Sequence, residues 1–148
     1  MTKAVHPIAG TLALLTILIF WTSTVLSEVF GSATTVVTVK TLIPWGFIVL
    51  IPALMTAGAS GFMLAKGRRD GLVDAKRKRM PLIAVNGVLF LIPSALFLAF
   101  KARAGEFDAI FCGVQAVELI AGAVNITLLG RNMWAGLRMS GRLRRRPA

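Results

Sequence analysis

The stretch AIFCGVQAVELIAGAVNITLL (residues 109–129) decides the class of fold, because it is apolar over a length that can cross a lipid bilayer. A hydrocarbon core needs about 20 such residues in a helix. Glu118 stands near the middle of this stretch. A charged group at that depth costs about 3 kcal/mol on insertion scales, so it usually faces a partner or a site. The segment therefore predicts a membrane-spanning helix with one polar position of interest.

Three further segments have a similar length and composition, at residues 7–26, 43–65 and 81–100. The chain is 56% hydrophobic, whereas soluble domains have about 45–50%. Backbone groups in lipid must be satisfied within each segment, so all four segments are expected to be helices. Short connections make consecutive helices antiparallel neighbours. The sequence predicts an all-α membrane protein: a single four-helix antiparallel bundle over residues 1–148, with a basic tail over residues 130–148.

The net charge of +11 is unevenly distributed. All but three of the 17 lysines and arginines lie before the first helix, between the second and third, or after the fourth; the exceptions are Lys40, Lys101 and Arg103. The positive-inside rule then places both termini in the cytoplasm, in a multi-pass protein. Basic clusters beside a bilayer also attract anionic lipid headgroups, at about 1 kcal/mol per residue. The expected headgroup residues are Arg68, Arg69, Lys76, Arg77, Lys78, Arg79, Arg144, Arg145 and Arg146.

Nucleic acid is not an expected partner, because few aromatic residues accompany the basic clusters to stack on bases. The expected partner is the bilayer itself, together with a membrane protein or a second copy of the chain. Small residues recur at four-residue spacing at Ala53, Ala57 and Gly61, a pattern typical of close helix approach. That approach can be to a helix of the same bundle or of a second subunit.

The segment from Ser27 to Lys40 is expected to be an external loop, since its residues 34–39 read Thr-Thr-Val-Val-Thr-Val and favour extended backbone. Glu28 and Lys40 frame this loop, and we expect them to pair across it. With Lys40 outside the membrane, no lysine or arginine would remain within the four spans. Glu118 would then be an unpaired carboxyl held in its neutral form, and glutamine could replace it without loss of the fold.

Polar residues align with Glu118 on one face of the fourth helix, since Gln115 and Asn125 lie three and seven positions away. Such a stripe turns towards the interior of a bundle. The possible partners on the other helices are Asn86, Ser94, Thr56, Ser60, Thr16, Thr22 and Ser23. Three interpretations follow. Glu118 can mark the polar site of a binding or accessory protein, can be the proton site of a small proton-coupled transporter, or can simply join helices through hydrogen bonds.

His6 is the only histidine and precedes the first predicted helix. As a functional residue it would be an axial ligand to haem b in an electron-transfer protein; otherwise it is an interfacial hydrogen-bonding residue. Cys112 is the only cysteine, so an intrachain disulfide is impossible. Neither a metal-ligand cluster nor a catalytic constellation is evident, and Glu106 and Asp108 read as a solvated cluster beside Lys101. We therefore do not expect an enzyme.

Several short segments resemble a group of small, uncharacterised four-helix inner-membrane proteins of bacteria. They begin with His6-Pro-Ile-Ala-Gly10, Ile43-Pro-Trp-Gly46 and Gly58-Ala-Ser-Gly61. Lys78-Arg-Met80 and the run from Glu118 to Asn125 follow the same pattern. The resemblance covers most of the chain. It implies a bacterial inner-membrane location and no particular activity.

Overall fold

The structure, a computed structural model, describes residues 2–66 and 71–139. In chain order its elements are α1 (Thr2–Phe30), α2 (Ala33–Ala65), α3 (Gly71–Asn86), the π-helical turn η1 (Gly87–Leu91), α4 (Ile92–Arg103) and α5 (Ala109–Met139). The described residues contain no strand. Five of the expected headgroup residues fall outside the described ranges: Arg68, Arg69, Arg144, Arg145 and Arg146.

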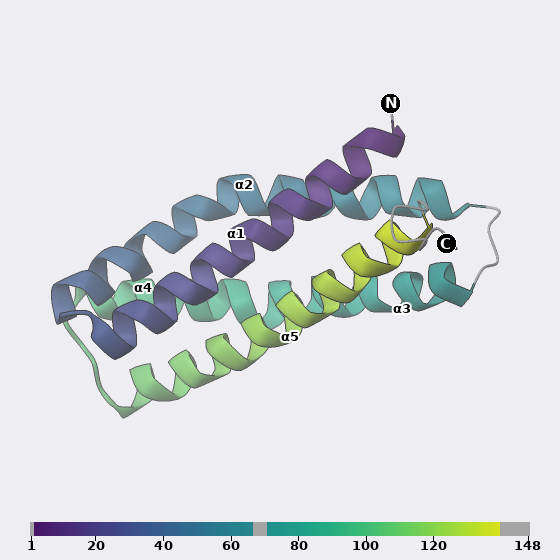
Figure 1. The fold of residues 1–148 in the computed structure, drawn as a ribbon. Helices are drawn as coiled ribbons and strands as arrows, with labels where there is room; N and C mark the ends of the chain where they lie inside the picture. The colour runs from purple at the N-terminus through teal and green to yellow at the C-terminus, as the bar shows by residue number, and fades with distance from the viewer. Residues whose placement is uncertain (1, 67–70, 140–148) are drawn as a thin grey trace, which may run out of the picture.

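The predicted all-helical protein with four long apolar segments is confirmed. Four helices are long and apolar enough to cross a membrane, because α3, η1 and α4 follow one another without a break and form one span. Figure 1 shows these elements lying lengthwise beside one another. The spans are longer than expected at several ends. In particular, the last helix continues through the basic segment to Met139 rather than ending at Leu129.

The expected external loop is wrong. Only Gly31 and Ser32 separate α1 from α2, and residues 34–39 are helical. Ser32 begins the helix as its N-cap, since its hydroxyl accepts a hydrogen bond from the N–H of Thr35 at 3.3 Å. A helix also satisfies every backbone group of the segment internally, and this outweighs the weak extended preference of valine and threonine. As a result Lys40 lies inside α2, one of the four apolar helices.

The third span carries its irregularity directly before Pro93, a residue type that favours a kink within a helix. The N–H of Ile92 bonds to the carbonyl of Gly87, five residues earlier, which is the π-helical pattern of η1. Pro93 then stands in the first turn of α4 and contributes no N–H to the continuous helix. The wide turn therefore accommodates the proline without ending the span.

Two apolar clusters hold the helices together. The larger joins α1, α2, α3 and α5 through Ala13, Leu14, Ile17, Leu50, Ala53, Ile83 and Leu129. The smaller joins α2, α4 and α5 through Val36, Leu98, Ala102 and Phe111. Lys40 on α2 and Glu118 on α5 each lie between residues of the smaller cluster and residues of the larger one along their helices. The layer that contains these two charged residues therefore has apolar packing on both sides. Large side chains such as Ile48, Met55 and Phe100 are exposed, as expected of surfaces that face lipid.

Candidate functional site: a buried ion pair beside a small cavity

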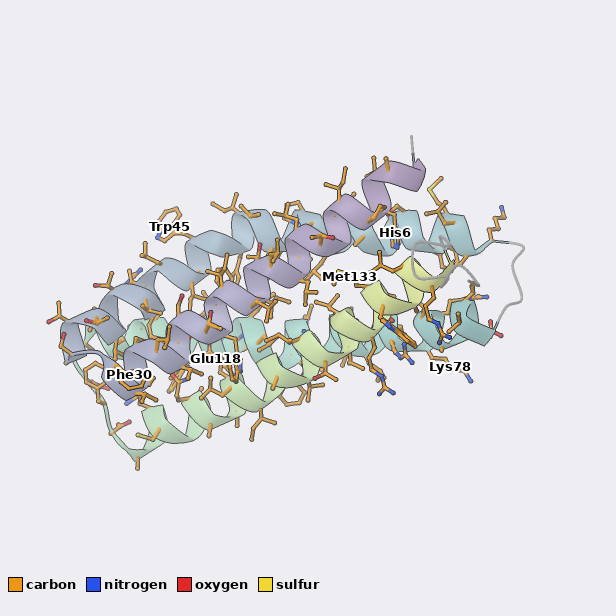
Figure 2. All side chains as sticks on the ribbon, in the orientation of Figure 1. His6, Phe30, Trp45, Lys78, Glu118 and Met133 are labelled. Atoms are coloured by element: carbon orange, nitrogen blue, oxygen red, sulfur yellow. The ribbon has the colours of Figure 1, made fainter. Side chains whose placement is uncertain are left out.

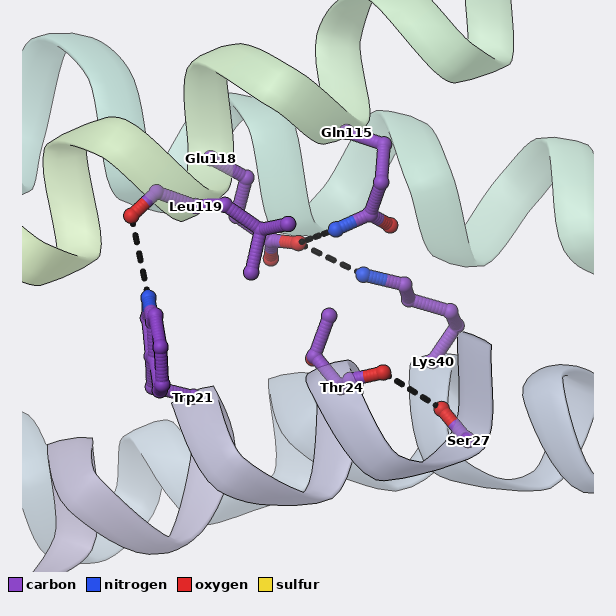
Figure 3. A network of polar contacts seen from close by, with 7 residues as sticks. All are labelled: Trp21, Thr24, Ser27, Lys40, Gln115, Glu118 and Leu119. Carbon is purple, nitrogen blue, oxygen red and sulfur yellow. Dashed lines mark hydrogen bonds and ion pairs between the residues drawn. The ribbon is translucent and has the colours of Figure 1, made fainter. Parts of the chain in front are cut away.

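Glu118 is paired with a lysine inside the helical bundle. The Nζ atom of Lys40 donates to Oε2 of Glu118 at 2.6 Å. The Lys40 residue is 0% exposed and Glu118 8% exposed. The expectation of an unpaired, neutral carboxyl is therefore wrong, and so is the expected pair between Glu28 and Lys40. In Figure 3 the two side chains approach from α2 and α5 and meet between these helices.

The pair forms because both residues occupy inward positions on their helices. Val36, Lys40 and Ile43 are all buried on α2, at helical spacing. On α5 the predicted polar stripe is buried, with Gln115, Glu118 and Asn125 at most 8% exposed. Gln115 adds a second donor to the same carboxylate oxygen, from its Nε2 at 3.3 Å. Such bonds offset part of the cost of removing two charges from water.

The other carboxylate oxygen, Oε1 of Glu118, makes no hydrogen bond with the described residues. Glu118 also lines a cavity of about 50 Å³ at the centre of the bundle. Since one water molecule needs about 10–15 Å³ of such a cavity, the space holds roughly four water-sized groups. The remaining lining residues are Ile17, Phe20, Trp21, Thr24, Ile43, Phe47, Leu50, Leu91, Ala95, Leu119 and Gly122.

Trp21 forms the wall of this cavity between α1 and α5. Its indole N–H donates to the backbone carbonyl of Leu119 at 3.0 Å (Figure 3). The ring lies against Gly122, where an added Cβ would stand only 2.8 Å from a ring carbon. Glycine at this position therefore lets the indole reach the α5 backbone, immediately after Glu118.

Asn86 and Asn125, both predicted as site residues, meet each other in a separate layer. The amide of Asn86 donates to Oδ1 of Asn125 at 2.9 Å and to the carbonyl of Ala121 at 2.8 Å. Asn125 is fully buried and donates in turn to the carbonyl of Ile83 at 3.4 Å. These bonds join α3 to α5 beside η1. The predicted polar stripe thus divides into a charged layer at Glu118 and an amide layer at Asn125.

His6 makes contacts through both ring nitrogens. Its Nδ1 lies 3.0 Å from the carbonyl of Ala57, so Nδ1 carries the proton and donates. Its Nε2 then accepts from Nζ of Lys76, at 2.8 Å. Gly61 provides room for the ring, since an added Cβ would lie 2.9 Å from it. With both nitrogens engaged, this geometry does not fit a haem ligand.

Lys76 is partly buried against α1 rather than directed wholly at lipid headgroups. The neighbouring Arg77 lies over the ring of Phe62, with the guanidinium carbon 5.7 Å from the ring centre. Figure 2 shows His6 and Lys78 towards the end of the molecule opposite Phe30. The basic face of α3 and the His6 contact thus belong to one end of the bundle, and the Lys40–Glu118 layer lies nearer the other.

The expected charge cluster between α4 and α5 is present. Lys101 bonds to Glu106 at 2.9 Å and to Asp108 at 2.6 Å. Asp108 also accepts from the N–H of Phe111 and so caps the start of α5. The hydrogen bond from Lys101, followed by that from Phe111, lowers the pKa of Asp108. This cluster fixes the connection between the last two helices. Within residues 2–66 and 71–139, His, Cys, Asp and Glu form no group of three that could hold a metal ion.

Comparisons of the sequence with protein families and with curated proteins, and of the fold with solved structures, gave no match. The site is therefore interpreted from its own geometry. Sequence reasoning found Glu118, Gln115, Asn86 and Asn125 but missed Lys40. The signal for it was the spacing of Val36, Lys40 and Ile43, which places a lysine in an apolar helical stripe.

Proposed function

We propose that this chain is a binding or accessory protein of the bacterial inner membrane, and not an enzyme. Four apolar helices long enough to cross a bilayer support the membrane location. We further propose an antiparallel bundle with both termini in the cytoplasm. The basic residues Arg77, Lys78 and Arg79 support this orientation, because they stand at the end of the bundle where α1 begins. In that position they contact anionic headgroups, as do the basic residues of the connection and tail.

One observation carries the binding assignment: a largely buried carboxylate with one free oxygen lines a half-open cavity. The free oxygen is accessible rather than fully buried, so a small solute in the cavity can reach it. Here Oε2 of Glu118 accepts from Lys40 and Gln115, while Oε1 is left without a protein donor. Apolar walls with a few convergent polar groups are typical of small-molecule sites.

The assignment can be tested by ligand-induced stabilisation of the purified protein in lipid nanodiscs. The probes are methylammonium, formate and methanol, which represent a cation, an anion and a neutral solute. Binding to the native state alone raises the melting temperature in a saturable way. The matched variant is Ala95→Leu, because Ala95 is buried and lines the cavity, so a leucine there fills the space.

We expect at least one probe to raise the melting temperature of the wild type saturably and to have no such effect on Ala95→Leu. The comparison uses the change in melting temperature that the probe causes in each protein. A lower melting temperature of the variant without probe therefore does not affect the result. Absence of a saturable shift with all three probes would overturn the assignment of a binding site.

A second candidate function, a small proton-coupled transporter, is favoured by a column of polar groups along α5. Glu118, Asn125 and Asn132 are buried and follow one another at seven-residue intervals, which is ~10 Å per step along a helix. Oδ1 of Asn132 is buried without a hydrogen bond. One turn beyond it, Gly136 lies close to Lys76, whose Nζ would be 3.8 Å from a Cβ there. This column runs from the charged layer towards the contact between Lys76 and His6.

Transport is tested by reconstituting the protein into liposomes that contain a pH-sensitive dye. A pH gradient that dissipates faster with the wild type than with Asn125→Leu would support the transporter, because that substitution interrupts the column at its fully buried member. Equal rates for the wild type, Asn125→Leu and empty liposomes would leave binding as the function.

A further inference from the structure

The ammonium group of Lys40 stands where a free cation would bind Glu118. Its Nζ lies 2.6 Å from Oε2, and the whole residue is excluded from solvent. Lys40 belongs to α2, while the carboxylate belongs to α5, so this cation is brought to the site by a different helix. Lys40 is thus an internal counter-ion that occupies one of the two carboxylate oxygens.

The cavity at this carboxylate has the chemistry of a site for a small organic cation. Phe20, Trp21 and Phe47 supply aromatic rings to its lining, and Glu118 is the only charged residue in that lining. Aromatic faces attract ammonium groups by about 0.5–2 kcal/mol each. The N–H donors of a small ammonium ion match the free oxygen of this carboxylate.

The charge of the site limits how such a cation can bind. One carboxylate cannot balance both a bound ammonium ion and the ammonium group of Lys40, and two cations in a low-dielectric interior repel strongly. Among residues 2–66 and 71–139, no acidic side chain other than Glu118 is buried. On α1 the neighbouring residues Trp21, Thr24 and Ser27 are uncharged, and Lys101 on α4 is engaged by the two acids of its own cluster.

We propose that the cavity binds a small ammonium cation, of about four non-hydrogen atoms or fewer, in exchange for one proton of Lys40. The N–H bond of Lys40 breaks, its electron pair remains on Nζ, and the proton passes to the solvent. The incoming cation becomes the ion-pair partner of Glu118, and the neutral amine of Lys40 can still donate a hydrogen bond. The net charge of the site does not change. This inference rests on the binding function proposed above and names its ligand.

The experiment uses the full-length protein in nanodiscs, with methylammonium chloride as the probe and sodium chloride as the ionic-strength control. Trp21 reports occupancy through its fluorescence in a Trp45→Phe, Trp134→Phe background, because both of those tryptophans are exposed and neither lines the cavity. A pH indicator in weakly buffered solution measures released protons. We expect saturable binding, one proton released per cation, and an apparent affinity that rises about tenfold per pH unit.

The decisive variant is Lys40→Arg, because arginine keeps the ion pair but cannot lose its proton in a protein. We expect it to bind methylammonium at least about tenfold more weakly than the wild type, with no proton release. Glu118→Gln is expected to abolish binding. Lys101→Arg is the matched control at a lysine outside the cavity and is expected to behave as the wild type does.

The outcomes separate the ligand class from the binding function. Saturable binding of methanol or formate without binding of methylammonium would overturn the cation assignment and leave the binding site in place. Binding of methylammonium without proton release, or with Lys40→Arg unchanged, would overturn the exchange. If no probe binds the wild type at all, both the ligand class and the binding function fall.

Discussion

Replacing Lys40 with methionine should destabilise the protein in a way that depends on pH. Methionine retains most of the apolar stem, but it leaves the buried Glu118 with Gln115 as its only donor. Removing one partner of a buried pair costs about 3–5 kcal/mol. The carboxyl can limit this cost by taking up a proton, which for an ordinary glutamate at pH 7 requires about 4 kcal/mol. We therefore expect Lys40→Met to lose 3–4 kcal/mol at about pH 7.

The pH dependence has a definite sign. Without its ammonium partner, the Glu118 carboxyl is expected to take up a proton in the folded Lys40→Met variant. In the unfolded chain a glutamate is ionised above a pH of about 4.3. The folded state then binds more protons, so stability falls as pH rises. The deficit relative to the wild type should grow by about 1.4 kcal/mol per unit between about pH 5 and 7.

The assay is equilibrium unfolding by denaturant in mixed micelles at several pH values, with the double variant Lys40→Met, Glu118→Gln as the control. The double variant has no buried charge at this layer, and we expect its stability to lie within about 1 kcal/mol of the wild type, without the pH slope. If Lys40→Met and the double variant unfold alike at every pH, the ion pair does not hold a charged carboxylate and the reasoning is refuted.

Three further predictions concern other contacts. Gly122→Ala should increase the quenching of Trp21 fluorescence by acrylamide and lower the stability by about 1–3 kcal/mol, because its Cβ would stand 2.8 Å from the Trp21 ring. Unchanged quenching would contradict the close approach. Asn125→Leu should cost about 1–3 kcal/mol in the same unfolding assay, since it leaves the Asn86 amide without one of its acceptors. It should cost more than Thr127→Leu, a matched change at an exposed helical bond. The pKa of Asp108 is lowered by the hydrogen bond from Lys101. Asp108 should therefore stabilise the connection between α4 and α5 at pH values above about 3.9, the ordinary pKa of aspartate. That stabilisation should be lost as the pH falls through the lower pKa of the folded state. Hydrogen exchange at the start of α5 should therefore quicken in acid for the wild type and be less sensitive to acid in Asp108→Asn.

The sequence was sufficient for the parts of this protein that depend on long-range composition. Apolar segments of the required length predicted the four helices, and helical spacing predicted that Gln115, Glu118 and Asn125 would share a buried face. Asn86 was expected among several possible partners of this face, because a polar side chain in an apolar helix seeks a partner on its neighbour. Its contact with Asn125 was not predicted specifically.

Lys40 was missed because the residue preferences and the membrane environment favour different backbone structures over residues 33–40. Valine and threonine favour extended backbone weakly, whereas a span in lipid requires helical hydrogen bonds. The contact between His6 and Lys76 joins residues 70 positions apart, so it depends on which helices pack together. A single sequence does not contain that arrangement.

The Lys40–Glu118 pair also constrains how the chain is assembled in the membrane. The lysine is synthesised in the second span and its counter-charge in the last, so Lys40 has no acidic partner until α5 enters the bilayer. Because α2 has 33 residues, about 50 Å of helix against a hydrocarbon core of about 30 Å, it can first sit with Lys40 at the headgroups and be drawn inwards later. A chain truncated before α5 would retain that lysine at the surface. Completion of the last helix would then allow the second helix to reach its final depth.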